Sequence, residues 1–270
     1  MRSRAPASER AWAAGLFDAE GCTTFTVERS GQRRLKASLP QSGHGRVADV
    51  LTRFQTVAAA GDIYGPWPNG SHVWEARGAA AVQVMILIWP WLGEVKREQF
   101  RAAIARYNDA ARTPRAMRTQ YVAPSSRTCS TTHLIAWAAG LFDGDGSTTN
   151  SVRRLKGEVV SAGIKASVSQ SGPEGIPEVL ERFASAVGFG AIYGPVRWRN
   201  ATEPGFEWTV QAYRDVRRLR EAIGPFVGPV KAAQLDGALA TFEASPHRRL
   251  SAFGLSRRPL AARRPDLPAN

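Results

Sequence analysis

The sequence of 270 residues is poor in cysteine and histidine, and neither occurs in a pattern that binds zinc or forms a redox pair. Cys22 and Cys129 are the only cysteines, and neither has a Cys-x-x-Cys partner. The four histidines show no ligand spacing and no sign of a Ser-His-Asp triad. We therefore exclude a disulfide framework and zinc chemistry, and we expect free thiols in a reducing compartment.

Long apolar runs are also missing. No run approaches the roughly 20 residues that a membrane-spanning helix needs. The basic start is followed by an apolar segment that Asp18 and Glu20 interrupt, so the start does not have the pattern of a signal peptide. We expect a soluble cytoplasmic protein, bacterial-type or organellar, with no export signal and no membrane partner.

Acidic residues are outnumbered, with 23 Asp and Glu against 36 Lys and Arg, which gives a formal net charge of +13. An excess of this size suggests a polyanionic partner. No basic amphipathic helix stands out, so nucleic acid is favoured over a membrane surface.

A stretch of ten residues occurs twice, at positions 12–21 and 137–146. The two copies read WAAGLFDAEG and WAAGLFDGDG, and they differ only at their eighth and ninth positions. The ninth position is Glu20 in the first copy and Asp145 in the second. The two copies keep a carboxylate there rather than one residue type, which points to a chemical role for this group.

The repeat extends over most of the chain. After each decapeptide come alternating polar and apolar residues that predict strands, including 35–41 and its counterpart 164–170. A helical pattern, a second hairpin and two further helices follow in each half. We expect an α+β protein of two pseudo-symmetric repeats. Its predicted parts are a first repeat at 1–109, a linker at 110–132, a second repeat at 133–245 and a basic, disordered tail at 246–270.

The start of each decapeptide has the pattern of a helix with small residues on one side. Small residues let two helix backbones approach closely, so we expect the two helices to pack against each other. The glycines at the ends, Gly21 and Gly146, are predicted to end these helices in the left-handed conformation. The predicted repeat interface consists of Ala13, Ala14, Gly15, Ala138, Ala139 and Gly140.

Glu20 and Asp145 would then lie at the C-terminal ends of two adjacent helices, where the helix dipole disfavours a carboxylate. A divalent cation compensates for such a placement because hard metal ions take carboxylate oxygens. The alternative is that each acid caps a neighbouring loop, but two copies on a basic repeat protein favour the metal site. Asp18 and Asp143 lie on another side of the helix, and we expect a structural role for them at the end of the helix pair.

The two decapeptides resemble the LAGLIDADG motif, and the chain from about residue 9 to residue 244 resembles a single-chain, two-repeat LAGLIDADG homing endonuclease. The resemblance implies αββαββα repeats about a pseudo-two-fold axis, with the motif helices at the interface and antiparallel sheets forming a DNA-binding saddle. It implies a monomer that cuts double-stranded DNA at a long, asymmetric target and leaves short 3′ overhangs. It also implies Mg²⁺ as cofactor, with Mn²⁺ substituting and Ca²⁺ supporting binding without cleavage.

The resemblance assigns roles to equivalent residues of both repeats. Glu20 departs from the aspartate of the motif name but keeps the ligand type. Lysine is rare in this sequence, and four of the five lysines form repeat-equivalent pairs, which independently supports a role for some of them. The implied roles are metal ligands for Glu20 and Asp145, positioning of the attacking water for Gln41 and Gln170, and the active-site basic residues for Lys96 and Lys231.

Polar strand faces are the predicted DNA-reading surface, because two-stranded ribbons fit the major groove, where base edges carry a distinct donor and acceptor pattern. The strands have diverged between the repeats, as Glu28 against Arg153 shows, so we expect a target that is only loosely palindromic. The candidate DNA-binding residues are Thr24, Thr26, Glu28, Arg34, Lys36, Ser38, Trp67, His72, Ser151, Arg153, Lys165, Ser167, Arg197 and Arg199.

Two other functions remain open at this point. One is a non-cleaving protein of the same fold, either an RNA splicing maturase or a DNA-binding regulator. The other is a nonspecific nuclease. Retention of an acid in both motifs favours the site-specific endonuclease.

Overall fold

The computed structural model describes residues 5–43, 46–109, 130–156, 158–173, 175–197 and 203–246. The first repeat consists of α1 (Ala7–Glu20), β1 (Cys22–Val27), β2 (Arg33–Ser42), α2 (Asp49–Ala58), β3 (Asp62–Tyr64), β4 (Ser71–Arg77), α3 (Ala79–Ile88), the short 3-10 helix η1 (Trp89–Trp91) and α4 (Glu94–Asp109). The second consists of α5 (Thr131–Asp145), β5 (Gly146–Leu155), β6 (Glu158–Ser171), α6 (Glu178–Val187), β7 (Ala191–Val196), β8 (Gly205–Val210), α7 (Tyr213–Ile223) and α8 (Pro229–Ala244).

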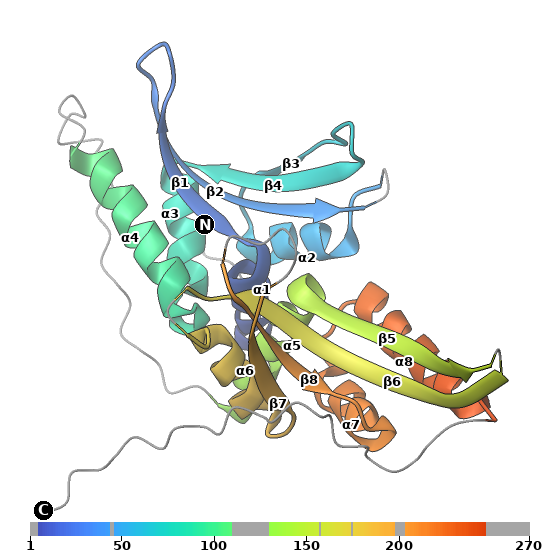
Figure 1. Cartoon of the computed structure of the whole chain (residues 1–270). Helices are drawn as coiled ribbons and strands as arrows, with labels where there is room; N and C mark the ends of the chain where they lie inside the picture. The colour runs from blue at the N-terminus through green and yellow to red at the C-terminus, as the bar shows by residue number, and fades with distance from the viewer. Residues whose placement is uncertain are drawn as a thin grey trace, which may run out of the picture.

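Each repeat forms one four-stranded antiparallel sheet, ordered β1-β2-β4-β3 in the first and β5-β6-β8-β7 in the second. The prediction of an α+β protein with two equivalent repeats is confirmed. Figure 1 shows the first repeat, blue to green, above the second, yellow to red, with α1 and α5 side by side between them. None of the described helices combines the length and the apolar character needed to cross a bilayer.

Most of the predicted linker and tail lies outside the described residues. The two ends that the structure describes are α5, which begins at Thr131 inside the predicted linker, and α8, which ends at Ala244. The helical start of α5 has a physical reason, because the Ser130 side chain accepts a hydrogen bond from the backbone N–H of His133 and caps the helix.

Each sheet has one covered and one open face. In β2 the buried side chains of Leu35, Ala37 and Leu39 alternate with less buried ones. The period of two places these three side chains against the helices and the intervening residues on the other face. Trp74 and Trp208 fill the equivalent covered position in the two repeats, and both are fully buried. The helices therefore pack on one side of each sheet and leave the strand faces with polar residues free.

The repeats meet where α1 and α5 contact each other backbone to backbone. A methyl group at Gly15 would lie 1.9 Å from the carbonyl oxygen of Trp137, and one at Gly140 would lie 1.9 Å from that of Trp12. Only glycine allows this approach. The flanking residues of the predicted interface, Ala13, Ala14, Ala138 and Ala139, are all buried.

Gly21 and Gly146 do not adopt the predicted left-handed conformation. Both have extended backbones, with φ of −72° and −68°; Gly21 leads directly into β1, and Gly146 is the first residue of β5. Glycine is needed for space instead. A methyl at Gly21 would lie 2.3 Å from the Phe17 ring, and one at Gly146 would lie 2.3 Å from the carbonyl oxygen of Phe142. The helix therefore passes into the strand without a separate turn.

Hydrogen bonds between the repeats fix the two motif helices lengthwise. The indole N–H of Trp12 donates to Asp143 at 2.7 Å, and that of Trp137 donates to Asp18 at 2.7 Å. Each buried carboxylate also accepts from the backbone N–H of a glycine that precedes the last helix of its own repeat. The structural role predicted for these two aspartates agrees with these contacts.

Both tryptophans are also covered by an arginine at equivalent positions of the repeats. The Arg53 guanidinium lies 3.8 Å from the ring centre of Trp12, and that of Arg182 lies 4.0 Å from the ring centre of Trp137. The sequence reasoning missed these two arginines, although their recurrence at matching positions of α2 and α6 is visible in the alignment of the repeats.

Replacing Gly140 by alanine tests the helix contact. We expect Gly140→Ala to lower the free energy of unfolding by at least about 2 kcal/mol, because the added methyl collides with rigid backbone. Gly237 in α8 is the matched control, because a methyl there meets no atom within 4 Å. Gly237→Ala should instead stabilise the helix, by up to about 1 kcal/mol. Urea denaturation of both variants measures the difference, and equal effects would contradict the contact.

Candidate active site and nucleic-acid surface

The two motif acids meet where α1 and α5 end. Glu20 is the last residue of α1 and Asp145 the last of α5, and both are half-buried. A methyl at Gly144 would lie 2.4 Å from Cβ of Ala19 and 3.1 Å from Cγ of Glu20. The space between the helix ends therefore holds the methyl group of Ala19 but not a second one from position 144. This explains why the eighth motif residue is alanine in one copy and glycine in the other.

Burial makes both acids hard to ionise, and repulsion adds to this effect at Asp145. Burial raises the pKa of Asp145 to about 7, and the charge of Glu20 adds to this effect. Burial also raises the pKa of Glu20. Lys96 and Lys231 act in the opposite direction on both groups, so the acids and the lysines form one electrostatically coupled cluster.

The two predicted active-site lysines lie beside the C-terminal ends of the motif helices. Lys96, at the start of α4, donates to the carbonyl oxygen of Gly21 at 2.7 Å. Lys231, at the start of α8, donates to that of Gly146 at 2.5 Å. Burial lowers the pKa of Lys231. Each ammonium group is thus held beside the acid of its own repeat by the residue that follows that acid.

The two predicted glutamines reach the acids from the ends of β2 and β6, but they do so differently. The amide nitrogen of Gln170 donates a hydrogen bond to Asp145. Gln41 lies beside Glu20 and favours its ionised form. Its amide nitrogen, however, is buried and does not close into a hydrogen bond with any described residue. The two halves of the site are therefore equivalent in residue type but not in contacts.

The donor set fits a hard divalent cation that keeps part of its water shell. Within the described ranges, no group of three or more His, Cys, Asp and Glu side chains could enclose a metal ion by itself. Two carboxylates that repel each other would both ionise more easily beside a dication. Such a pair, with further oxygen ligands from solvent or a bound phosphate, is the kind of site that Mg²⁺ uses.

The open sheet faces hold most of the predicted DNA-binding residues. Strand register pairs Thr24 with Lys36 and Thr26 with Arg34 in the first sheet, and all four side chains lie on the open face. The same face holds Ser38, and Glu28 follows directly after β1 and forms an ion pair with Arg34. In the second sheet the open face holds Ser151, Arg153 and Lys165, whereas Ser167 lies on the same side of β6 but is only 5% exposed.

The remaining four predicted DNA-binding residues come from the second hairpins. Trp67, in the turn between β3 and β4, is exposed, and so is Arg197 after β7. Arg199 lies outside the described residues. His72 does not lie on the open face as predicted. It shares the covered face of β4 with Trp74, two residues further on, and is only 4% exposed.

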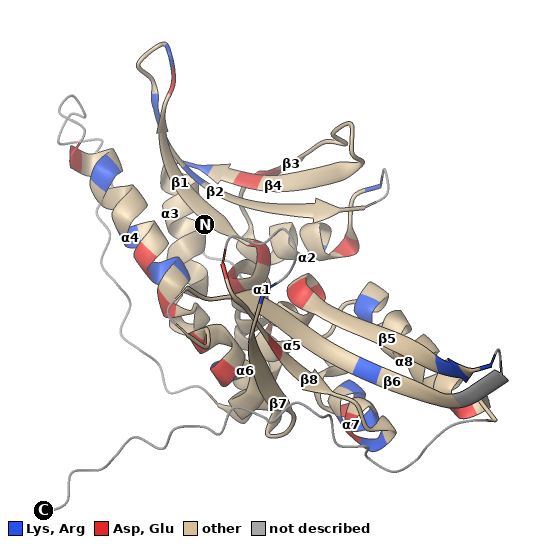
Figure 2. Ribbon diagram, viewed as in Figure 1, with Lys and Arg blue, Asp and Glu red and all other residues tan. Residues whose placement is uncertain are grey.

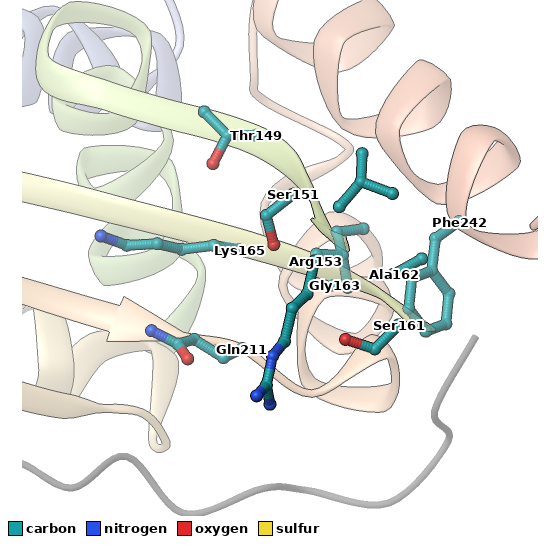
Figure 3. Close-up of a pocket in the computed structure, with 11 residues that line it drawn as sticks. Thr149, Ser151, Arg153, Ser161, Ala162, Gly163, Lys165, Gln211 and Phe242 are labelled. Atoms are coloured by element: carbon teal, nitrogen blue, oxygen red, sulfur yellow. The ribbon is translucent and has the colours of Figure 1, made fainter. Parts of the chain in front are cut away.

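A hollow of about 460 Å³ lies on the second sheet. Figure 3 shows Ser151, Arg153, Lys165 and Gln211 around it. Gly163 contributes no side chain there, and a methyl at that position would lie 2.7 Å from Oγ of Ser151. Polar and basic groups thus surround a recess in the strand face rather than a flat surface.

Basic residues on the open faces are paired with acids of neighbouring strands. The Lys36 ammonium lies 3.1 Å from Glu75, and that of Lys165 lies 2.7 Å from Glu207. Figure 2 shows further basic residues, in blue, at the tip of the β1–β2 hairpin and at the end of β5. These lysines differ from Lys96 and Lys231, which bond to backbone carbonyl oxygens beside the motif acids.

Comparison with solved structures places this arrangement in a known fold. The chain superposes on the LAGLIDADG homing endonuclease I-GzeII in complex with its DNA target with a TM-score of 0.56 and 13% sequence identity, covering 86% of this chain and 89% of the other. The LAGLIDADG meganuclease I-AabMI bound to uncleaved DNA gives a TM-score of 0.58 at 11% identity, with the same coverage of 86% and 89%. I-SmaMI bound to an uncleaved DNA target in the presence of calcium ions gives 0.55 at 13%, with 86% and 90% covered.

The chain has the fold of the single-chain LAGLIDADG homing endonucleases. The two decapeptides form the central helices α1 and α5 of this fold, as the sequence resemblance implied. At the level of sequence, the chain matches no protein-family model and no curated protein.

The raised pKa of Asp145 has a consequence for stability in metal-free buffer. The folded state keeps this proton up to about pH 7, whereas the unfolded chain loses it near the ordinary value of 3.8. The folded state therefore binds the extra proton between these values, and stability falls as the pH rises through this window. The variant Asp145→Asn cannot ionise.

We expect Asp145→Asn to be more stable than the wild type at pH 8 in EDTA, and this difference to close as the pH falls toward 4. Urea denaturation across this pH range measures it. A constant offset between the two proteins at all pH values would show that Asp145 has an ordinary pKa.

Proposed function

We propose that this protein is a site-specific homing endonuclease that hydrolyses one phosphodiester bond in each strand of a long, asymmetric DNA target and leaves short 3′ overhangs. The observation that carries the proposal is the meeting of Glu20 and Asp145 at the end of the helix pair, with a lysine and a glutamine beside each acid. I-GzeII and I-AabMI, whose fold the chain shares, are bound to DNA in their solved structures.

Each proposed half-site contains a group that binds metal and a group that orients water. Glu20 and Asp145 would hold divalent metal, with Mg²⁺ as the proposed cofactor and Mn²⁺ as a substitute. A divalent metal held by these acids would lower the pKa of water and neutralise charge on the phosphate. Gln41 and Gln170 orient the hydrolytic water through their amide groups.

Lys96 and Lys231 supply positive charge next to the reacting phosphates. Their ammonium groups are fixed by the Gly21 and Gly146 carbonyl oxygens, so they need little reorganisation when negative charge develops. The half-buried position of Lys231 strengthens its interaction with an anion, because water screens it less.

Target recognition is assigned to the open strand faces. The β1–β2 and β5–β6 hairpins have the width of ribbons that enter the DNA major groove. Because the two faces carry different residues, such as Glu28 and Arg153, the two half-targets are expected to differ in sequence. DNA would have to compete with Glu75 and Glu207 for the two strand-face lysines.

Cleavage of a plasmid that carries the target tests the metal-dependent reaction. We expect linear product with Mg²⁺ or Mn²⁺ and binding without cleavage with Ca²⁺. Glu20→Gln and Asp145→Asn should each reduce the rate of linearisation by at least about 100-fold, because each removes a metal ligand.

Different results would identify other functions on this fold. Tight binding of the target without any cut would favour a DNA-binding regulator, and binding of intron RNA without DNA cleavage would favour a splicing maturase. Degradation of every duplex would indicate a nonspecific nuclease. Two acid variants that cut like the wild type would overturn the assignment of the site.

Replacement of the lysines tests electrostatic catalysis separately from metal binding. We expect Lys96→Met and Lys231→Met each to slow cleavage by about 10- to 1,000-fold and to change DNA affinity little. Lys156, which follows β5 in the turn of the hairpin, is the control, because it is exposed and the whole length of β5 separates it from Asp145. A loss of DNA binding equal to the loss of rate would assign the two lysines to target binding instead.

A further inference from the structure

His72 is a buried imidazole that the proposed mechanism does not use. It is 4% exposed, and its Nδ1 makes no hydrogen bond to any described residue. An unpartnered buried polar atom costs about 1 to 3 kcal/mol, so its retention in a core position needs a reason. The packing around it does not supply one, because an apolar side chain would fill the same space without this cost.

The nearest candidate partner is Gln41. The two residues are directly opposite each other on β2 and β4, and both side chains lie on the covered side of the sheet. Side chains at such positions have Cβ atoms about 4.5 to 5.5 Å apart. The amide nitrogen of Gln41 is the other buried nitrogen in this region without a hydrogen bond. A donor and a possible acceptor are thus adjacent: Nδ1 of His72 has no partner among the described residues, and the Gln41 amide approaches Glu20 but its nitrogen does not close a hydrogen bond.

The turn between β3 and β4 fixes the orientation of the His72 ring. A methyl at Gly65 would lie 2.9 Å from Cδ2 of His72, so this edge of the imidazole packs against the β3–β4 turn. Nδ1 is on the opposite edge of the ring from Cδ2. The contact therefore turns Nδ1 away from the turn that holds Gly65.

The second repeat has a different residue at the position equivalent to His72. Gln170 is opposite Phe206, whose ring packs against Gly194 as His72 packs against Gly65. Phenylalanine offers no acceptor, and there the amide nitrogen of Gln170 is held by Asp145 instead. In the second half-site, then, the NH₂ end of the amide is already fixed and its oxygen is the end left for water.

We propose that His72 is a positioning residue for Gln41 and that only the first half-site uses one. The neutral imidazole accepts a hydrogen bond through Nδ1 from the amide nitrogen of Gln41, directly or through one water molecule. The second N–H of the amide remains directed to Glu20, and the amide oxygen remains free to orient the hydrolytic water. The proposal rests on the endonuclease function proposed above and adds that the two strands are cut through differently supported glutamines.

Strand-specific cleavage tests this role, with a target selected from a randomised duplex library and a different label on each strand. His72→Phe copies the second repeat. It should slow, by about tenfold, only the strand whose cleavage Gln41→Ala also slows. His72→Asn keeps an acceptor near the position of Nδ1 and should restore most of the rate. In the Gln41→Ala background, His72→Phe should have no further effect.

The second strand is the internal control for folding, because a misfolded variant would lose cleavage of both strands. Equal slowing of both strands, no slowing of either, or an additive effect in the Gln41→Ala background would each overturn the positioning role. If the wild type cuts no duplex in the library, the endonuclease function fails, and the role of His72 in cleavage fails with it.

A measurement without metal or DNA distinguishes a failure of the endonuclease function from a failure of the contact between His72 and Gln41. In ¹⁵N spectra of the metal-free protein, the Nδ1 signal of His72 should shift in Gln41→Ala and stay unchanged in Gln170→Ala. This result would support the contact between the two side chains whether or not cleavage is found. A signal that responds to neither variant, or equally to both, would overturn it.

Discussion

The backbone contact between α1 and α5 is the constraint on which the rest of this structure depends. Gly15 and Gly140 each lie against a carbonyl oxygen of the other helix, so the helices are as close as two backbones allow. This closeness brings the helix ends together, and with them the two acids. Like charges held in a half-buried site resist ionisation, which is the condition that a divalent cation relieves. The packing of two glycines and the chemistry proposed for two carboxylates are therefore parts of one arrangement.

The two pairs of acidic residues in the motifs differ in how deeply they are buried. Asp18 and Asp143 are buried, and burial raises the pKa of each to about 6, although each accepts an indole and a backbone hydrogen bond. They hold the two repeats in register. Glu20 and Asp145, two residues further on, are half-exposed at the mouth between the sheets. One helical segment thus carries both the contacts between the repeats and the acids proposed for chemistry, on different sides of the helix.

The sequence predicted the architecture, and it pointed to the residues that lie beside the two motif acids, because the repeat shows these features twice. The motif helices, the strand faces and the residues Gln41, Gln170, Lys96 and Lys231 were all found from positions that recur. Features that depend on how closely two particular groups approach each other in the folded chain could not be predicted from the repeat. The extended backbone of Gly21 follows from the place of the Phe17 ring, and the alanine and glycine at the eighth motif positions follow from a contact between the helices. His72 was assigned to the wrong face because a polar residue in a strand predicts exposure, and only the register shows that it shares the covered side with Trp74.

The claim that the helix contact unites the two acids can be measured directly by following their carboxyl ¹³C signals through a pH titration of the metal-free protein. We predict that Asp145 titrates at about 7 and that Glu20→Gln lowers this value, because the variant removes the neighbouring charge. Asp145 titrating near its ordinary value of 3.8, or titrating identically in the wild type and in Glu20→Gln, would show that the two acids do not share a site.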